Sequence, residues 1–198
     1  MRSTLFDYQL DIDKIAQEPA DPRDSAKLML VDRKTGGITD RRVSDLTEIL
    51  STNNVLVFNQ TKVIPVRLLG TKSTGGKVEL LLVKQLGSDT WEAISKPGLK
   101  VGQKIEVEAL RAEVIEKKEE TVILKFGDRG EFLRERIFEF GKTPIPPYIH
   151  SQKTERELRR VYQTVYAKKE GSVAAPTAGL HFSRDLLAAL QKKGIQTE

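Results

Sequence analysis

Six short strand patterns follow one another between residues 67 and 126 of this chain, and turn signals separate most of them. Apolar and charged residues alternate within them, as in Lys104–Glu108, so one face of each strand is expected to be buried and the other solvated. Short strands with glycine- and proline-containing turns predict a small antiparallel barrel or sandwich. The expected strands are Arg67–Thr71, Lys77–Lys84, Thr90–Ser95, Lys104–Leu110, Ala112–Glu116 and Thr121–Phe126.

The sequence before this run mixes strand and helix patterns. Leu28–Asp32 and Ile38–Arg42 are expected to pair as a hairpin across a glycine-containing turn. Ser44 is expected to cap a short helix ending before Asn53, because serine is a favourable N-cap residue. Val55–Phe58 is a wholly apolar run, the pattern of a strand buried on both faces of a sheet.

After the strand run, Glu131–Phe140 is predicted to be a helix, and the proline-rich link Pro144–Pro147 leads back toward the first part of the fold. The predicted fold class is therefore an α/β main domain with an inserted small antiparallel β-barrel domain. Residues 1–64 and 145–198 are expected to form the main domain, and residues 65–144 the inserted barrel.

Composition excludes some classes of protein and site. The chain has no cysteine, which removes disulfides, a thiol nucleophile and a thiolate metal site. It has no apolar run near 18 residues and no signal-peptide pattern, so a cytoplasmic protein without membrane insertion is expected. A net charge of +5 suits an anionic partner such as RNA.

A run of small or rigid residues lies between Gly171 and Gly179, which is poor material for a core. Such a run allows close approach of the backbone to a ligand, because glycine lacks a Cβ and proline restricts φ. His181 follows, and Ser183 then begins an apolar-periodic segment that Gly194 can end. The pattern predicts a loop that delivers an imidazole to the start of a helix; an extended loop before an ordinary helix is the alternative.

The sequence contains no phosphate-loop, dinucleotide-binding or histidine metal-binding motif. Gly70–Lys77 is similar to a phosphate loop, but its lysine comes one position late and Val78 stands where serine or threonine is needed. A hairpin turn is predicted there instead, and no G-x-G dinucleotide fingerprint occurs anywhere. The two histidines, His150 and His181, lack ligand-like spacing, so no metal site is expected.

The strings YQTVYA at 162–167 and GSVAAPTAGLHF at 171–182 resemble the signature of the S-adenosylmethionine:tRNA ribosyltransferase-isomerase family of queuosine biosynthesis. Further similar strings occur in the family's order and extend the resemblance over essentially the whole chain. Lys62 stands where the family more often has arginine, and Gln60 where it has asparagine or aspartate. Family members continue well beyond Glu198, so the chain is expected to be an N-terminal portion. The further strings are IAQEPADPRDSAKLMLVDRKTG, VLVFNQTKVIPVRLLG, GGKVELLLVKQ and TPIPPYI.

The resemblance implies the same domain layout and a specific reaction. Family members transfer and isomerise the ribosyl moiety of S-adenosylmethionine onto 7-aminomethyl-7-deazaguanine at the tRNA wobble position, giving epoxyqueuosine and releasing methionine and adenine. For this chain it implies a monomeric, cytoplasmic RNA-binding transferase whose partners are that tRNA and S-adenosylmethionine. No cofactor beyond this co-substrate, and no metal, is expected.

For this reaction His181 and Thr177 are the candidate catalytic residues. An imidazole is suited to proton transfer near neutral pH, and the departing adenine needs a proton or hydrogen bonds. The alternative for His181 is a structural residue that ties the loop to the helix. Thr177 and the amides of Ala178 and Gly179 are candidates to hold ribose hydroxyls or the methionine carboxylate.

Gln163 and Tyr166 are candidates to contact adenine or the target base by hydrogen bonding and stacking. The alternative is helix packing, because apolar and aromatic residues from Leu158 to Tyr166 fall at helical spacing.

A second candidate cluster follows the apolar run Val55–Phe58. Asn59 and Thr61 are predicted to bind substrate, because α/β domains place ligands at the carboxyl ends of such strands. Lys62 and Arg67 are predicted to bind tRNA phosphates. Between residues 156 and 169 a basic run either steers RNA or is a solvated helix face. Its members are Arg156, Arg159, Arg160, Lys168 and Lys169.

A non-catalytic RNA-binding module is the competing function. A barrel that binds single strands is expected to present exposed aromatic residues for stacking. Trp91 and Phe126 are nearly the only aromatic residues in the strand run, which favours the enzyme.

Overall fold

The computed structural model describes residues 2–198, and this part of the chain divides into two compact units. The first unit comprises Met1–Leu56, Ile145–Lys153 and His181–Glu198. The second comprises Val57–Pro144 and Thr154–Leu180. The second unit thus includes 154–180, which the predicted division assigned to the main domain; that division into domains stays a prediction.

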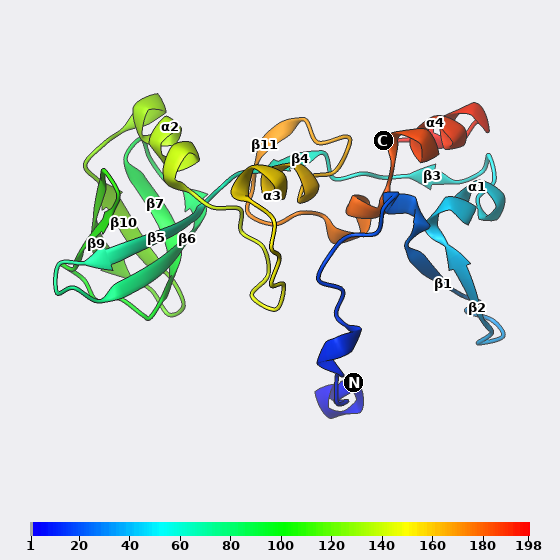
Figure 1. The fold of residues 1–198 in the computed structure, drawn as a ribbon, viewed down its shortest axis with the longest axis horizontal. Helices are drawn as coiled ribbons and strands as arrows, with labels where there is room; N and C mark the ends of the chain where they lie inside the picture. The colour runs from blue at the N-terminus through cyan, green and yellow to red at the C-terminus, as the bar shows by residue number, and fades with distance from the viewer. Residues whose placement is uncertain (1) are drawn as a thin grey trace. The chain divides into compact units, whose positions relative to one another are not determined.

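The barrel of the second unit is closed and antiparallel, as the strand patterns predicted (Figure 1). Its strand order is β10-β7-β6-β5-β8-β9. Every predicted strand is present, with ends shifted by at most a few residues. The strands are β5 (Arg67–Lys72), β6 (Lys77–Gln85), β7 (Thr90–Lys96), β8 (Lys104–Val107), β9 (Leu110–Lys117) and β10 (Val122–Phe126).

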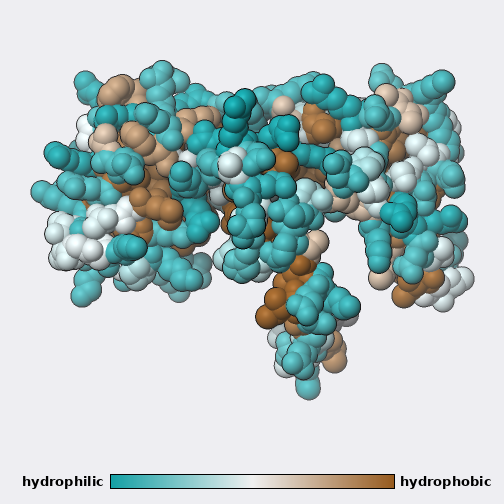
Figure 2. All heavy atoms as spheres, in the orientation of Figure 1, coloured by the Kyte–Doolittle hydropathy of each residue, from teal (hydrophilic) through white to brown (hydrophobic). Residues whose placement is uncertain are grey.

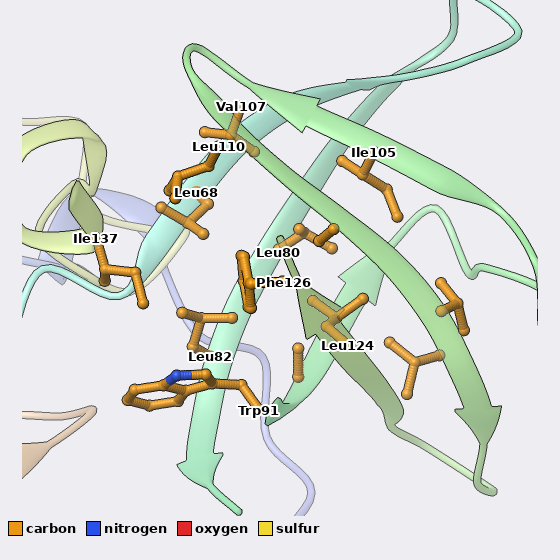
Figure 3. Close-up of a cluster of buried hydrophobic side chains, with 14 of the residues drawn as sticks. Leu68, Leu80, Leu82, Trp91, Ile105, Val107, Leu110, Leu124, Phe126 and Ile137 are labelled. Atoms are coloured by element: carbon orange, nitrogen blue, oxygen red, sulfur yellow. The ribbon is translucent and has the colours of Figure 1, made fainter. Parts of the chain in front are cut away.

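Alternation along the strands forms the barrel core. Val78, Leu80 and Leu82 of β6 are buried at every second position, as expected for a strand with one face inside. Figure 3 shows Leu80 and Leu82 inside the cluster that side chains of the other strands complete. The helix α2 (Gly130–Phe140), predicted at 131–140, packs Leu133 and Ile137 into the same cluster.

Residues 70–77, whose sequence is similar to a phosphate loop, instead form the predicted hairpin between β5 and β6. Gly75 has a φ of +86° in its turn. Gly70 allows β5 to lie close to β8. A Cβ at this position would stand 2.7 Å from the carbonyl oxygen of Glu106, so only glycine fits without a shift.

The other elements of the second unit surround a short parallel strand pair. β4 (Thr61–Val63) pairs in parallel with β11 (Lys169–Ser172). The helix α3 (Glu155–Val161) begins with a capping box in which Thr154 and Glu157 exchange hydrogen bonds. It is followed by turns rather than by further helix, and the 3₁₀ helix η5 spans Thr177–His181.

The first unit has a small core. Val43, Leu186, Leu190 and Ile195 are buried together. Its strands are β1 (Lys27–Val31) and β2 (Ile38–Arg42), which form the predicted hairpin, and β3 (Val55–Leu56) and β12 (Gln196–Thr197), which pair in parallel. Its helices are α1 (Leu46–Ile49), α4 (Arg184–Lys192) and the 3₁₀ helices η1 (Ser3–Phe6), η2 (Ile12–Lys14), η3 (Arg23–Ser25) and η4 (Val43–Asp45).

Two local expectations in this unit are wrong. Ser44 lies inside η4 and caps no helix; the residue at the N-cap of α1 is Asp45, whose carboxylate instead accepts a hydrogen bond from the Arg42 N–H at the start of η4, at 2.9 Å. The apolar run at 55–58 is not a strand buried on both faces, because only Val55–Leu56 is a strand, in a two-stranded sheet. Val55 is 47% exposed and Val57 is 80% exposed, since apolar composition alone does not supply a covering layer.

Large apolar side chains are exposed along the N-terminal segment, including Leu5, Phe6, Leu10 and Ile12. Figure 2 shows hydrophobic residues gathered on this segment. Among the helices of residues 2–198, none combines the length and apolar character needed to cross a bilayer.

Candidate functional site

The parallel pairing of β4 with β11 brings residues 61–63, within the second predicted cluster, beside residues 169–172. In its register Thr61 lies opposite Lys169 and Lys62 opposite Glu170. The carbonyl of Gln60 accepts from the amide of Lys168 at 2.8 Å. Residues around 60 and residues around 170 are therefore neighbours in space, which no local sequence pattern indicated.

Gln163 holds this arrangement through its side chain. Its Oε1 accepts from the Val63 N–H at 3.0 Å, and its Nε2 donates to the Val63 carbonyl at 2.6 Å. The helix-packing alternative is wrong for Gln163 and Tyr166, because α3 ends at Val161. Hydrogen bonds to a distant strand replace the helical bonds that the spacing suggested.

Tyr166 lies between Phe58 and Gly179. The rings of Tyr166 and Phe58 have centroids 4.6 Å apart and planes inclined by 46°. A Cβ on Gly179 would collide with the Tyr166 hydroxyl and would lie 3.1 Å from the Thr164 methyl group, so this contact requires glycine. Burial raises the pKa of the Tyr166 hydroxyl above its ordinary value.

The run of small residues between Gly171 and Gly179 contains both exposed and buried residues. Thr177 and Ala178 are exposed, whereas Ala175 and Gly179 are buried. The amide of Gly179 donates to the carbonyl of Pro176 at 2.8 Å. A ligand bound by this amide would have to displace that bond, whereas the Thr177 side chain is accessible to solvent.

His181 is exposed and ends η5, two positions before Ser183, the N-cap residue of the helix α4. The helix α4 starts where the sequence predicted, and Ser183 caps it, because its hydroxyl accepts from the Leu186 N–H at 3.0 Å. The same hydroxyl donates to the carboxylate of Asp24, which connects η3 to the start of α4. The segment that follows His181 is thus held at the helix start by two hydrogen bonds.

Asn59 and Thr61 form a local turn. The Asn59 Oδ1 accepts from the Thr61 N–H at 2.9 Å and from the Thr61 hydroxyl at 2.7 Å. The Lys62 Nζ lies 3.8 Å from a carboxylate oxygen of Glu170, and half of the Lys62 side chain is exposed. Lys62 is therefore accessible to an anion.

Arg67 is less accessible. Its Nη2 pairs with the carboxylate of Glu79 on the next barrel strand at 2.8 Å, and its side chain is 31% exposed. A phosphate at Arg67 would have to share this guanidinium with Glu79.

The basic run separates into two kinds of side chain. Arg159 is half-buried: its Nε pairs with Glu155 at 2.9 Å, and its Nη2 donates at 2.8 Å to the carbonyls of both Phe138 and Gly141. Arg156 and Arg160 are exposed on the same helix. Arg159 is thus structural, whereas Arg156 and Arg160 are exposed to solvent.

A cavity of about 390 Å³ in the second unit includes residues that the sequence reasoning missed. Lys84, Trp91, Arg134 and Glu170 all contribute to its wall. They come from the strands β6, β7 and β11 and from the helix α2. Because these elements are distant in sequence, no local sequence pattern places the four residues together. Within residues 2–198, no group of three or more potential ligands could hold a metal ion.

Comparison with known proteins gives consistent matches. The family described as queuosine biosynthesis protein matches residues 3–198. The S-adenosylmethionine:tRNA ribosyltransferase-isomerase of Thermotoga petrophila is 47% identical over 200 residues, covering 99% of this chain and 58% of the relative. The enzyme of the same name from Fusobacterium nucleatum is 47% identical over 197 residues, covering 96% of this chain and 55% of the relative.

Among solved structures, the S-adenosylmethionine tRNA ribosyltransferase of Thermotoga maritima is similar at 32% identity, with a TM-score of 0.39. That match covers 98% of this chain and 56% of the solved chain. The chain thus spans somewhat more than half the length of the relatives that it matches. Because the family match extends from residue 3 to residue 198, the chain belongs to the queuosine biosynthesis protein family.

Proposed function

We propose that this chain is part of a tRNA-modifying transferase-isomerase. The reaction moves the ribosyl moiety of S-adenosylmethionine onto 7-aminomethyl-7-deazaguanine at the wobble position, isomerises it to epoxyqueuosine, and releases methionine and adenine. Family membership carries this proposal, because the relatives named for this enzyme are 47% identical over nearly the whole chain. The enzyme acts as a cytoplasmic monomer with S-adenosylmethionine as co-substrate and no metal.

The substrate site is proposed around the β4–β11 pair. The exposed Thr177 and Ala178 directly precede Gly179, which contacts Tyr166, as the run Thr177-Ala178-Gly179. Thr177 is suited to hold a ribose hydroxyl, and the face of Tyr166 to contact a base. Asn59 and Thr61 are further substrate contacts in this proposal. Gln163 stays a predicted substrate contact. A substrate bound by its side-chain amide would have to replace the two hydrogen bonds that this amide makes to the Val63 backbone.

His181 is proposed to transfer the proton. The sulfonium of S-adenosylmethionine acidifies the C5′ hydrogens, so a base at that carbon can begin the reaction. Adenine leaves poorly as an anion and departs more readily if an acid protonates it. General acid–base catalysis contributes on the order of 10²–10⁴-fold, which is the loss expected on removal of the imidazole.

The tRNA is proposed to bind through exposed cations. Lys62 is half exposed on β4, and Arg156 and Arg160 are exposed on α3. Arg67 stays a predicted phosphate contact that would compete with Glu79. Each phosphate contact adds to an affinity that falls with salt.

We also propose the α/β main domain with an inserted barrel as the domain layout. The parallel pairs β3–β12 and β4–β11 support it, because parallel strands require crossover connections of the kind found in α/β folds. The barrel residues lie between the sequence segments of the first unit, which agrees with an insertion.

An adenine-release assay tests the reaction. The protein is incubated with S-adenosylmethionine and tRNA that carries the aminomethyl-deazaguanine base, and free adenine is quantified by chromatography. We expect release that requires this tRNA and falls on the order of 10²–10⁴-fold in His181→Ala. The matched control is His150→Ala, since these are the two histidines of the chain.

The assay distinguishes the proposed reaction from the proposed role of His181. If adenine release persists in His181→Ala, the transferase proposal stands and the proton-transfer role of His181 is rejected. The same assay is run on a chain extended to the length of the relatives, and absence of release from both folded proteins rejects the transferase.

The competing RNA-binding module finds less support in the barrel. Among the described strands β5–β10 the aromatic residues are Trp91 and Phe126, which are 7% and 3% exposed. Neither offers a free face for a row of stacked bases.

A further inference from the structure

The segment that carries His181 is fixed on its C-terminal side by the core of the first unit. Phe182, the next residue, is partly buried and packs against this core. Ser183 follows and caps α4, whose Leu186 is buried in the same core. The His181 side chain is exposed, so the backbone that carries it, rather than packing of the ring, sets where the imidazole stands.

Ser183 makes one hydrogen bond more than a helix cap requires. A cap needs only an acceptor, and the Ser183 Oγ accepts from the Leu186 N–H at 3.0 Å. The single hydroxyl proton is donated to Oδ2 of Asp24, which lies 159 positions away in the sequence. Because the proton points to Asp24, the lone pairs of the oxygen are left for the Leu186 N–H. The carboxylate therefore fixes the orientation of the capping hydroxyl.

Asp24 is itself held in place by its surroundings. It is partly buried and lies in η3. The hydroxyl of the next residue, Ser25, donates to the Pro22 carbonyl at 2.7 Å, and the Arg42 Nη1 donates to the Ser25 carbonyl at 2.6 Å. The carboxylate thus reaches Ser183 from a turn that is anchored to the end of β2. Hydrogen bonds to an ionised acceptor are among the stronger ones in proteins.

From these contacts we infer that Asp24 is a positioning residue for the proton transfer at His181. Its carboxylate holds Ser183, and Ser183 holds the chain from which the imidazole projects. The catalytic part of this inference rests on the proposed function, whereas the holding of the imidazole does not. Position matters because displacement of a catalytic group by about 1 Å can slow a reaction on the order of 10²-fold.

The histidine ring signals test the positioning without an enzyme assay. The chain has two histidines, so a proton–carbon correlation spectrum contains two Cε1–Hε1 signals, and His150→Ala identifies the signal of His181. Spectra are recorded on the intact chain at one pH, and thermal unfolding establishes that each variant is folded. The variants compared are Asp24→Ala, Asp24→Asn, Ser183→Ala and Asp185→Ala.

We expect Asp24→Ala and Ser183→Ala to shift or broaden the His181 signal and to leave the His150 signal in place. Asp24→Asn should keep the wild-type signal, because its amide oxygen can still accept from the Ser183 hydroxyl. Asp185→Ala is the matched control and should also keep it, since Asp185 is an exposed carboxylate in the first turn of α4.

Adenine release tests the catalytic consequence. The kcat of Asp24→Ala should fall on the order of 10–10²-fold with little change in the KM for S-adenosylmethionine, and Asp24→Asn should retain most of the rate. In the His181→Ala background, Asp24→Ala should lower release no further. A residue that only stabilises the fold would lower release by the same factor in both backgrounds.

A His181 signal that is unchanged in Asp24→Ala and in Ser183→Ala overturns the inference. An equal change of this signal in Asp24→Asn or in Asp185→Ala also overturns it, because the charge rather than the hydrogen bond would then be responsible. If release persists in His181→Ala, the catalytic part is rejected together with the proton-transfer role. The histidine signals then decide by themselves whether Asp24 holds the imidazole.

Discussion

The side-chain amide of Gln163 makes two hydrogen bonds to the backbone of Val63, accepting from its N–H at 3.0 Å and donating to its carbonyl at 2.6 Å. In this way a side chain takes the place of a neighbouring strand at β4. Val63 is buried, so its backbone groups have little access to water as a substitute.

Replacement of Gln163 by alanine should therefore destabilise the second unit. Two backbone groups lose their partners, and an unsatisfied buried group costs about 1–3 kcal/mol. Urea unfolding of Gln163→Ala is expected to show a loss in this range, whereas the exposed Gln152→Ala should change the free energy of unfolding little. Equal stabilities of the two variants would contradict this role.

Gly179→Ala should destabilise through overpacking. The added methyl collides with the Tyr166 hydroxyl, and such insertions cost about 1–3 kcal/mol. Because the hydroxyl is the main obstacle, Tyr166→Phe should partly restore stability in the double variant. Gly98→Ala is the control, since a Cβ there meets nothing within 4 Å. Strictly additive effects at 179 and 166 in a double-mutant cycle would refute the contact.

Arg159→Lys is expected to lower stability although it keeps the charge. A lysine cannot reproduce the guanidinium contacts to Glu155 and to the carbonyls of Phe138 and Gly141. We expect a loss of about 1–3 kcal/mol in denaturant unfolding. The matched control is Arg156→Lys, because Arg156 is exposed on the same helix. Similar losses in the free energy of unfolding in both variants would argue against a stabilising role of the Arg159 hydrogen bonds.

Acid should weaken the barrel partly through Glu92. The Thr121 hydroxyl, which donates to Glu92 at 2.7 Å, and the Lys118 ammonium hold the pKa of Glu92 below its ordinary value of 4.5. A carboxyl with a lowered folded-state pKa contributes stability above its unfolded pKa and loses it as the pH falls through the folded value. Unfolding measured below pH 4.5 should thus depend less steeply on pH in Glu92→Gln. Glu116→Gln should keep the steeper dependence; identical slopes in both variants would exclude this contribution.

Local patterns predicted the barrel well. Apolar and polar residues alternate along β6 and β9 because successive side chains of a strand point to opposite faces, a rule that involves neighbouring residues only. The turn residues at 73–76 and 97–98 determine where the strands beside them end. The Ser183 cap is equally local, because its hydrogen bond spans three residues. Each of these features was confirmed.

Local patterns failed where distant segments compete for a residue. Helical spacing from Leu158 to Tyr166 suggested one helix, but Gln163 bonds to Val63 instead. The apolar run at 55–58 suggested burial, but burial depends on what covers it. The predicted catalytic and binding roles stay predictions for the assays described above.

The sequence by itself determined the strand periods, the turns, the helix start at Ser183 and the family, since all of these are encoded in neighbouring residues. Only the tertiary structure decided that β4 lies beside β11 and that Trp91, Arg134 and Glu170 surround one cavity. The physical reason is that these contacts join segments tens of residues apart. Their formation depends on chain closure and on the summed packing of the barrel, which no short window of sequence contains.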